Sequence, residues 1–269
     1  MCYSILVKRD MDYLAKRYGA IALRGQSEAY EDLTKKNPKQ FPASSPRIYP
    51  GHYGPVIFGS DHQLQSELMR YGTYPPDTVR NIHKYSAFNA RSDNLRSHFW
   101  SNAFMCHHGF VVLDAFYEWV AVKDLLKAGV VRLEEVDLEF ARQSEERKAR
   151  ILKDGKPYKP TPTELKPSIE RQIIIQFKPE DESDLIVPVI FSRTNISTEN
   201  EVVNAGFAVI TDEPSPEIRA AGHDRSPIIL QSGAEREWCR IDGKKPENFE
   251  HLLSARRRVI FRHGLAKAV

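Results

Sequence analysis

The sequence predicts an α+β fold that is mainly β, in a single domain over residues 1–269. Short apolar runs of strand length recur along the chain, whereas long amphipathic helices are few. Hydrophobic residues make up 41% of the sequence, which is enough for a substantial core. We therefore expect short strands that form a barrel-like or sandwiched sheet, with helices at its periphery.

The first 120 residues supply half of the expected strands. An apolar strand is predicted over 2–7 and an amphipathic helix over 11–18, with Asp10 as its N-cap. Five prolines make 37–55 a loop, and the elements after it are a strand over 55–59, a helix over 93–104 and a strand over 109–120.

The C-terminal part returns to short strands after a segment of different composition. Residues 121–170 are highly charged and then rich in proline, so we expect a charged helical and loop insertion. The next elements are strands over 171–177, 185–191 and 206–211 and a helix over 234–239. Pro188 has no N–H group, which predicts that the strand over 185–191 is an edge or bulged strand.

Composition excludes several classes of protein. The sequence has no run of eighteen apolar residues, which argues against a transmembrane helix. Its first residues have too short an apolar stretch for a signal peptide, so we expect a cytoplasmic protein without a membrane partner. The three cysteines are far apart and odd in number, which suits a reducing compartment. Cys106, His107 and His108 lie side by side without a fourth ligand at the usual spacing, so no metal or other cofactor is expected.

The net charge is only +3, but basic residues are unevenly distributed. Residues 256–267 contain five Lys and Arg and no acid, and residues 8–47 combine basic residues with tyrosines. Cations and exposed rings suit single-stranded nucleic acid, because cations meet phosphates and rings stack on bases. A solvated charged surface and buried aromatic rings explain the same pattern, and the charge alone does not decide between them.

Cys2 is the most informative residue. Removal of Met1 would leave a residue that carries an α-amine and a thiol on adjacent carbons. Such an aminothiol condenses with an aldehyde to an imine, which the thiol then closes to a thiazolidine. The amine and the thiol titrate near pH 8 and 8.5, so both are partly nucleophilic close to neutrality.

Four short motifs follow one another in a specific order. They are Met-Cys at 1–2, Asn-Ala-Arg at 89–91, Phe-Tyr-Glu-Trp at 116–119 and His-Asp-Arg-Ser-Pro at 223–227. In this order they resemble the SOS response-associated peptidase (SRAP) family, whose members crosslink to abasic sites in DNA. The resemblance covers about residues 1–120 and 185–240, and it implies covalent capture of abasic sites in single-stranded DNA.

The resemblance also implies the catalytic residues. Cys2 matches the cysteine that captures the ring-opened sugar, and Asn89 matches the asparagine that holds this cysteine or the sugar. Glu118 matches the catalytic glutamate, which shuttles protons during imine formation and ring closure. His223 matches the active-site histidine, which favours the open aldehyde or assists release of the crosslink.

DNA contacts are implied for four further residues. Arg91 and Arg225 would face phosphates, Thr211 would place a hydroxyl near the active site, and Tyr71 would stack on or wedge beside a base. The expected partner is single-stranded DNA with abasic sites, bound by a monomer associated with the nucleoid of a bacterium.

The opening of the chain departs from the family pattern. The usual Met-Cys-Gly-Arg reads Met-Cys-Tyr-Ser here, so Ser4 stands where an arginine normally binds phosphate. Whether Lys8 or Arg9 replaces that arginine is open. The common Asn-x-x-Pro segment has Arg47 in place of its asparagine.

Two other functions remain open at this stage. Cys2 with His223 or Glu118 as its base would also suit an N-terminal-nucleophile peptidase or amidase. Only Met1 precedes Cys2, so little autoprocessing is expected, which weighs against this alternative. The altered opening is also compatible with a noncatalytic module that binds nucleic acid.

Overall fold

The structure is a computed structural model that describes residues 2–38, 41, 43, 45–60, 63–73, 87–193 and 205–266. Its helices are α1 (Met11–Tyr18), α2 (Arg24–Lys36), α3 (Ser101–Cys106), α4 (Val122–Lys127), α5 (Leu133–Lys153), α6 (Pro216–Ala220), α7 (Ala234–Cys239) and α8 (Pro246–Ser254). Its strands are β1 (Ser4–Val7), β2 (Ala20–Ala22), β3 (Arg47–Ile48), β4 (Tyr53–Ser60), β5 (Gln63–Tyr71), β6 (Asn89–Arg91), β7 (His108–Ala121), β8 (Gln172–Pro179), β9 (Leu185–Arg193), β10 (Ala205–Asp212), β11 (Ser226–Pro227) and β12 (Phe261–Leu265).

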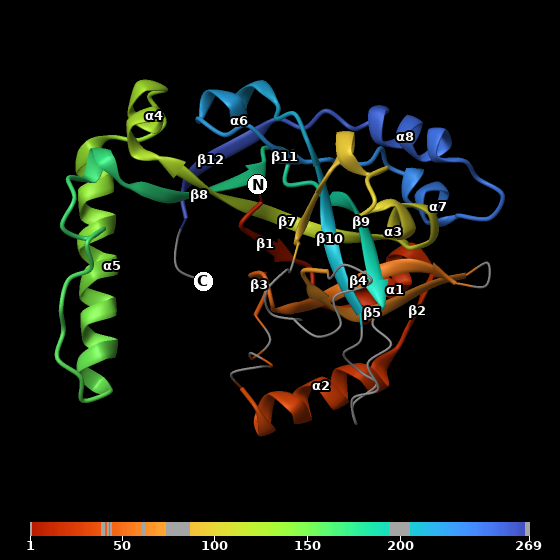
Figure 1. The fold of residues 1–269 in the computed structure, drawn as a ribbon, viewed down its shortest axis with the longest axis horizontal. Helices are drawn as coiled ribbons and strands as arrows, with labels where there is room; N and C mark the ends of the chain where they lie inside the picture. The colour runs from red at the N-terminus through yellow and green to blue at the C-terminus, as the bar shows by residue number, and fades with distance from the viewer. Residues whose placement is uncertain are drawn as a thin grey trace.

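Five strands pair around a closed ring. β4 pairs with β5 and β7, β9 pairs with β7 and β10, and a parallel β10–β5 pair completes the circle. This ring, with helices around it, confirms the predicted α+β fold with a barrel-like sheet (Figure 1). The C-terminal half of β7 extends beyond the ring, where β1 and β8 pair with it. That extension carries the Phe-Tyr-Glu-Trp motif.

Local signals predicted α1 correctly. The Asp10 side chain accepts a hydrogen bond from the N–H of Tyr13 at 2.9 Å, as an N-cap does. Gly19 ends the helix in the left-handed conformation with φ 66°.

The helix predicted over 93–104 is wrong. A short 3₁₀ turn, η1 (Ser92–Asn94), and α3 stand in its place, with turns between them. Leu95 and Trp100 are both buried in the same apolar cluster. Residues five apart point about 140° away from each other on an α-helix, so a continuous helix would not bury both.

The prediction that β9 is an edge or bulged strand is also wrong, because β9 lies between β7 and β10. The two neighbours are staggered along it. Pro188 pairs with Phe110 of β7, whereas pairing with β10 begins only at Val189. Pro188 therefore faces a paired strand on one side only, and the strand tolerates its missing N–H.

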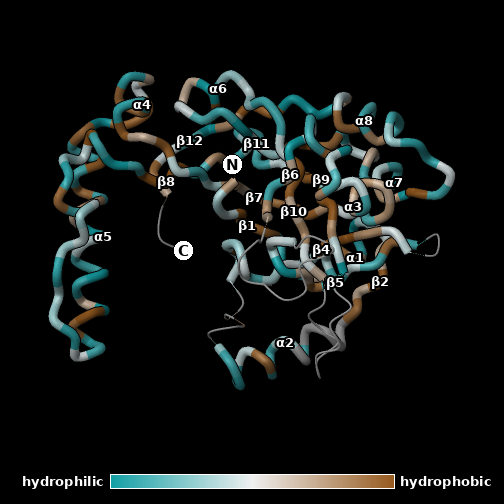
Figure 2. Tube along the Cα trace, in the orientation of Figure 1, coloured by the Kyte–Doolittle hydropathy of each residue, from teal (hydrophilic) through white to brown (hydrophobic). Residues whose placement is uncertain are grey.

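The charged segment forms α4 and α5, and α5 stands apart from the barrel (Figure 1). Hydrophilic residues dominate α5, whereas the strands of the barrel are largely hydrophobic (Figure 2). Val136 and Phe140 are its buried residues, and the guanidinium of Arg171 lies 3.4 Å from the centre of the Phe140 ring. That this segment is an insertion stays a prediction. Within the described ranges, no helix combines the length and apolarity needed to cross a membrane.

Candidate active site around Cys2

Strand pairing brings the start of the chain to the Phe-Tyr-Glu-Trp motif. β1 runs antiparallel to β7, with Ser4 opposite Tyr117. The N–H of Tyr3 donates to the carbonyl of Tyr117 at 3.0 Å. This pairing brings the first residues of the chain alongside Glu118, whose carboxyl lies close enough to act on the Cys2 thiol through its charge.

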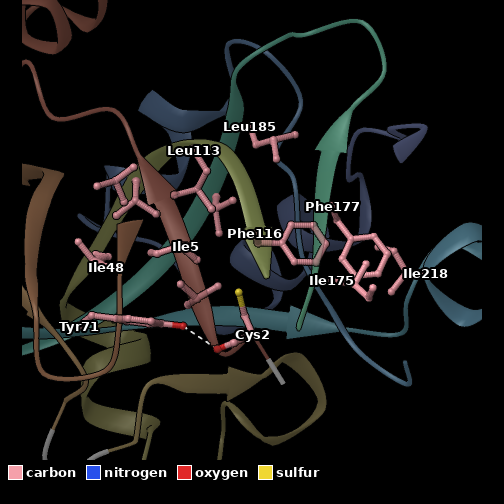
Figure 3. Close-up of a cluster of buried hydrophobic side chains, with 14 of the residues drawn as sticks. Cys2, Ile5, Ile48, Tyr71, Leu113, Phe116, Ile175, Phe177, Leu185 and Ile218 are labelled. Carbon is pink, nitrogen blue, oxygen red and sulfur yellow. Dashed lines mark hydrogen bonds between the residues drawn. The ribbon is translucent and has the colours of Figure 1, made fainter. Parts of the chain in front are cut away.

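Two side chains from other strands hold the backbone of Cys2. The hydroxyl of Tyr71, at the end of β5, donates to the Cys2 carbonyl oxygen at 2.9 Å (Figure 3). The amide nitrogen of Asn89, at the start of β6, donates to the same oxygen at 3.1 Å. The Oδ1 atom of Asn89 is buried and accepts no hydrogen bond from a described residue. Asn89 therefore fixes Cys2 with one atom and presents an acceptor with the other.

The thiol of Cys2 points into the apolar cluster, toward Phe116 (Figure 3). Its sulfur lies 3.6 Å from the carbonyl oxygen of Ser4. Burial, and then the nearby charge of Glu118, raise the pKa of this thiol well above its ordinary value. A neutral thiol is a poor nucleophile, so reaction at sulfur requires a base that takes its proton.

Glu118 and His223 form a buried pair beside Cys2. The carboxyl of Glu118 is 1% exposed, and its Oε2 atom lies 3.3 Å from Nε2 of His223. Burial raises the pKa of Glu118 well above its ordinary value and lowers the pKa of His223. Desolvation thus favours the uncharged form of both groups. A carboxyl that keeps its proton near neutrality can act as a general acid and then, deprotonated, as a base.

The loop after α6 orients the histidine ring. Nδ1 of His223 lies 2.8 Å from the backbone carbonyl oxygen of Arg225, and the N–H of Arg225 lies 3.3 Å from the same Nδ1. The shorter contact is a hydrogen bond in the tautomer that carries its hydrogen on Nδ1. Nε2 then accepts, which matches a protonated Glu118 as the donor. Gly222 precedes the ring with φ 86°, and a Cβ atom there would lie 2.8 Å from Cβ of Asp124. Only glycine fits this turn without movement.

The structure buries both Tyr71 and Thr211, which were expected among the DNA contacts. The Tyr71 ring is fully buried and stacks on Phe207 with their centroids 5.2 Å apart. Since it has no exposed face, it positions Cys2 instead of stacking on a base. Thr211 is also fully buried, 3.5 Å from the carbonyl oxygen of Ala90, and holds β10 to β6.

The two predicted phosphate contacts lie closer to the surface. Arg91, in β6 two residues after Asn89, has a side chain 51% exposed. Its Nε atom donates to Asp93 at 2.9 Å, and the hydrogen bonding between these two side chains is the main cause of the lowered pKa of Asp93. Arg225 contributes to the same lowering through its charge. Both guanidinium groups therefore lie near Asp93, at the rim of the site.

The basic C-terminal stretch is largely engaged within the protein. Arg256 pairs with Asp212 at 2.7 Å, and Arg257 donates to the hydroxyl of Ser183 at 2.7 Å. Arg262 pairs with Glu182 at 2.6 Å. Of the two remaining cations of the stretch, Arg258 is exposed, and Lys267 lies outside the described residues.

Cys106, His107 and His108 do not converge. Cys106 is exposed, whereas His108 is buried and stacks on Trp238 with their centroids 3.9 Å apart. Both ring nitrogens of His108 lie within 2.9 Å of carbonyl oxygens, those of Phe104 and Trp238. Burial lowers the pKa of His108 to about 4. In the described part of the chain, no group of three or more His, Cys, Asp or Glu side chains is placed to hold a metal.

Comparison with known families places the chain in a family over nearly its whole length. The model of the SOS response associated peptidase (SRAP) family matches residues 1–264. The chain belongs to the SRAP family. No curated protein matches it.

Solved structures share the SRAP fold of this chain at low sequence identity. A Bordetella bronchiseptica protein is 16% identical with a TM-score of 0.59, and the alignment covers 99% of this chain and 100% of that one. A Bacteroides thetaiotaomicron protein is 14% identical with a TM-score of 0.58 and coverages of 99% and 92%. A phage-related protein from Bordetella bronchiseptica is 14% identical with a TM-score of 0.56 and coverages of 99% and 95%.

Glu118 predicts a pH-dependent effect on the stability of this SRAP protein. Because burial raises its pKa in the folded state, the folded protein keeps this proton to a higher pH than the unfolded chain does. Stability is therefore lost as the pH rises from the unfolded pKa, about 4.3, toward the folded one. Glutamine cannot lose a proton, so Glu118→Gln should gain thermal stability over the parent, increasingly as the pH rises.

Calorimetry at about pH 4, 6 and 8 measures this effect through the difference in Tm between variant and parent. We expect the difference to be smallest at the lowest pH. A difference that stays constant across the series would contradict a buried carboxyl with a raised pKa.

Proposed function

We propose that the protein captures abasic sites in single-stranded DNA covalently, through a thiazolidine on Cys2 formed after removal of Met1. In this role it shields damaged DNA during the SOS response. The SRAP family is associated in general with the response to DNA damage, and the proposal specifies one reaction within that role.

One observation carries the proposal. Cys2 is held by its carbonyl oxygen, through Tyr71 and Asn89, next to the buried pair of Glu118 and His223. An aminothiol that reacts with an aldehyde needs its amine held in place and a proton carrier beside it. The arrangement fixes the backbone of Cys2 through β5 and β6 and sets a carboxyl from β7 and an imidazole from the loop after α6 beside it, which supports the proposal.

The proposed chemistry is balanced without any other reagent. The amine of Cys2 adds to the aldehyde of the ring-opened deoxyribose, and loss of one water gives an imine. The imine forms in its protonated state and keeps one hydrogen on nitrogen. The thiol gives up its proton and adds to the imine carbon, which closes the thiazolidine ring. Glu118 would protonate the departing hydroxyl and then, as the carboxylate, accept the thiol proton.

The sugar of an abasic site is accessible at low cost. It carries no base, so no stacking or pairing is lost when it turns toward the protein. Arg91 and Arg225, near Asp93 at the rim, would then face the phosphates on either side.

A denaturing gel tests the proposal. The Met1-processed protein, with its free Cys2 amine verified by mass spectrometry, is incubated with abasic and with intact single-stranded DNA. We expect a denaturation-resistant band with abasic DNA only, and its loss in Cys2→Ala. An equal band in Cys2→Ala would refute capture by Cys2. No band with the processed protein, together with turnover of a peptide substrate, would favour the peptidase function instead.

A further inference from the structure

Arg47 lies on β3, the strand that pairs with β1 next to the start of the chain. β3 pairs antiparallel with β1, with Leu6 opposite Arg47. The Nε atom of Arg47 donates to the hydroxyl oxygen of Ser4 at 3.1 Å. Ser4 comes two residues after Cys2, so the guanidinium lies beside the proposed site of capture.

This guanidinium is buried, and no carboxylate among the described residues forms an ion pair with it. Arg47 is 6% exposed, and its Nη2 atom is buried with no hydrogen-bond partner. Besides the Ser4 hydroxyl, two ring faces lie against it. The Tyr117 ring centre lies 3.7 Å from the guanidinium carbon and that of Tyr49 lies 5.1 Å away. Ring faces compensate a desolvated charge only in part, so a buried cation in this state is unusual.

The other two basic residues near the chain start are already engaged. Lys8 forms ion pairs with Asp114 at 2.8 Å and with Asp184 at 3.2 Å. Arg9 donates from Nη1 to the backbone carbonyls of Ser45 at 2.6 Å and Tyr53 at 3.1 Å. Neither Lys8 nor Arg9 is therefore placed to bind an anion beside Cys2.

A layer of partly exposed rings covers Arg47. Tyr49 packs edge-on against Tyr3 with their centroids 5.7 Å apart, and Tyr3 packs in the same way against Trp119 at 5.5 Å. Trp119 is 40% exposed. Displacement of Tyr49 would open the unpaired Nη2 to a ligand, and the displaced rings would lie where neighbouring bases can stack.

We propose that Arg47 is the phosphate-binding arginine of this site, which holds a phosphodiester of the captured strand next to Cys2. Arg47, on β3, would thus bind the phosphate that the residue at position 4 cannot bind here, because Ser4 carries no charge. The guanidinium fork matches two phosphate oxygens, and the phosphate supplies a counter-ion that no described residue provides. This inference rests on the proposed function, because it requires single-stranded DNA as the ligand.

Salt-dependent binding of a DNA that cannot react tests the inference. The probe is a single-stranded oligonucleotide with a tetrahydrofuran analogue of the abasic site, which has no aldehyde, and all variants carry Cys2→Ala. The affinity is measured between about 50 and 200 mM salt, where each phosphate contact contributes about 0.7 to the slope of log K against log salt. We expect Arg47→Asn to reduce the slope by about 0.7 and to weaken binding about tenfold.

Two further variants make the result decisive. Ser4→Arg combined with Arg47→Asn moves the arginine back to β1 and should restore the slope, which a purely structural role of Arg47 would not predict. Arg132→Gln removes an exposed cation at the start of α5 and should leave the slope unchanged. If Arg47→Asn does not fold, Arg47→Lys decides instead. If Arg47→Lys binds DNA more weakly but with the same salt slope, the result supports a two-point contact between the guanidinium and the phosphate. If Arg47→Lys binds DNA with unchanged affinity, the inference is overturned.

Parallel gels with reactive abasic DNA separate this inference from the proposed function. A slope unchanged by Arg47→Asn, with crosslinking intact in the Cys2 protein, overturns the role of Arg47 alone. A reduced slope without any crosslink in the Cys2 protein supports Arg47 as a phosphate contact and overturns covalent capture.

Discussion

Glu118→Gln should slow crosslinking to abasic DNA by about 10²- to 10⁴-fold, the usual contribution of general acid–base catalysis. The Glu118 carboxyl is buried beside Cys2 and 3.3 Å from His223, and in the proposed reaction it carries the proton for both loss of water and ring closure. An amide keeps the shape and the hydrogen bonds but cannot exchange the proton. The rate of adduct formation under single-turnover conditions, read from a denaturing gel, measures the effect.

Asp114→Asn is the matched control for this prediction. Asp114 lies on the same strand, where it pairs with Lys8 at 2.8 Å, away from His223. Its variant should react at nearly the parental rate. A Glu118→Gln protein that also reacts at the parental rate would show that Cys2 needs no proton carrier at this position.

The second large effect concerns stability. Phe116→Ala should lower the free energy of unfolding by about 3–5 kcal/mol. Phe116 is fully buried, stacks on Phe177 with a centroid distance of 5.1 Å, and meets the edge of Phe261 at 5.4 Å. Paired strands wall the cavity that alanine would leave, so the surroundings cannot collapse to fill it. Urea unfolding followed by tryptophan fluorescence measures the loss.

Trp119→Ala serves as the comparison for Phe116→Ala. Trp119 lies three residues along the same strand but is 40% exposed, so its loss should cost about 1 kcal/mol or less. Equal losses for the two variants would contradict a core centred on Phe116. Because Phe116 packs beneath Cys2, its variant should also react more slowly with abasic DNA than the parent protein does.

Sequence patterns predicted the elements whose signals are local. α1 has its cap at Asp10 and its stop at Gly19, and both signals lie within one turn of the helix. β5 has no such signal and was not predicted. It buries Ser66 and Glu67 among its apolar residues, and Glu67 is stabilised there by Arg193 at 2.6 Å. Because the residue that pairs with Glu67 lies more than a hundred residues away, no local sequence pattern indicated that this segment is a strand.

The candidate site was predicted through resemblance, not through spacing. Nothing local in the sequence indicates that Cys2, Asn89, Glu118 and His223 meet, because strand pairing across the barrel brings them together. The same limit explains Tyr71, whose ring looked suited to stacking on a base until the fold buried it. Arg47 and Ser4 both depart from the family pattern. Those paired departures were the signal in the sequence, but only the register of β1 and β3 shows that the two residues touch.

The intact mass of the adduct tests the central claim most directly. Met1-processed protein is allowed to react with an abasic oligonucleotide, and the product is weighed without reduction. Capture through a thiazolidine predicts the sum of the two masses less one water, with both the amine and the thiol of Cys2 blocked in the digested peptide. An adduct that forms elsewhere in the chain, or a Cys2 thiol that still alkylates freely, would contradict it.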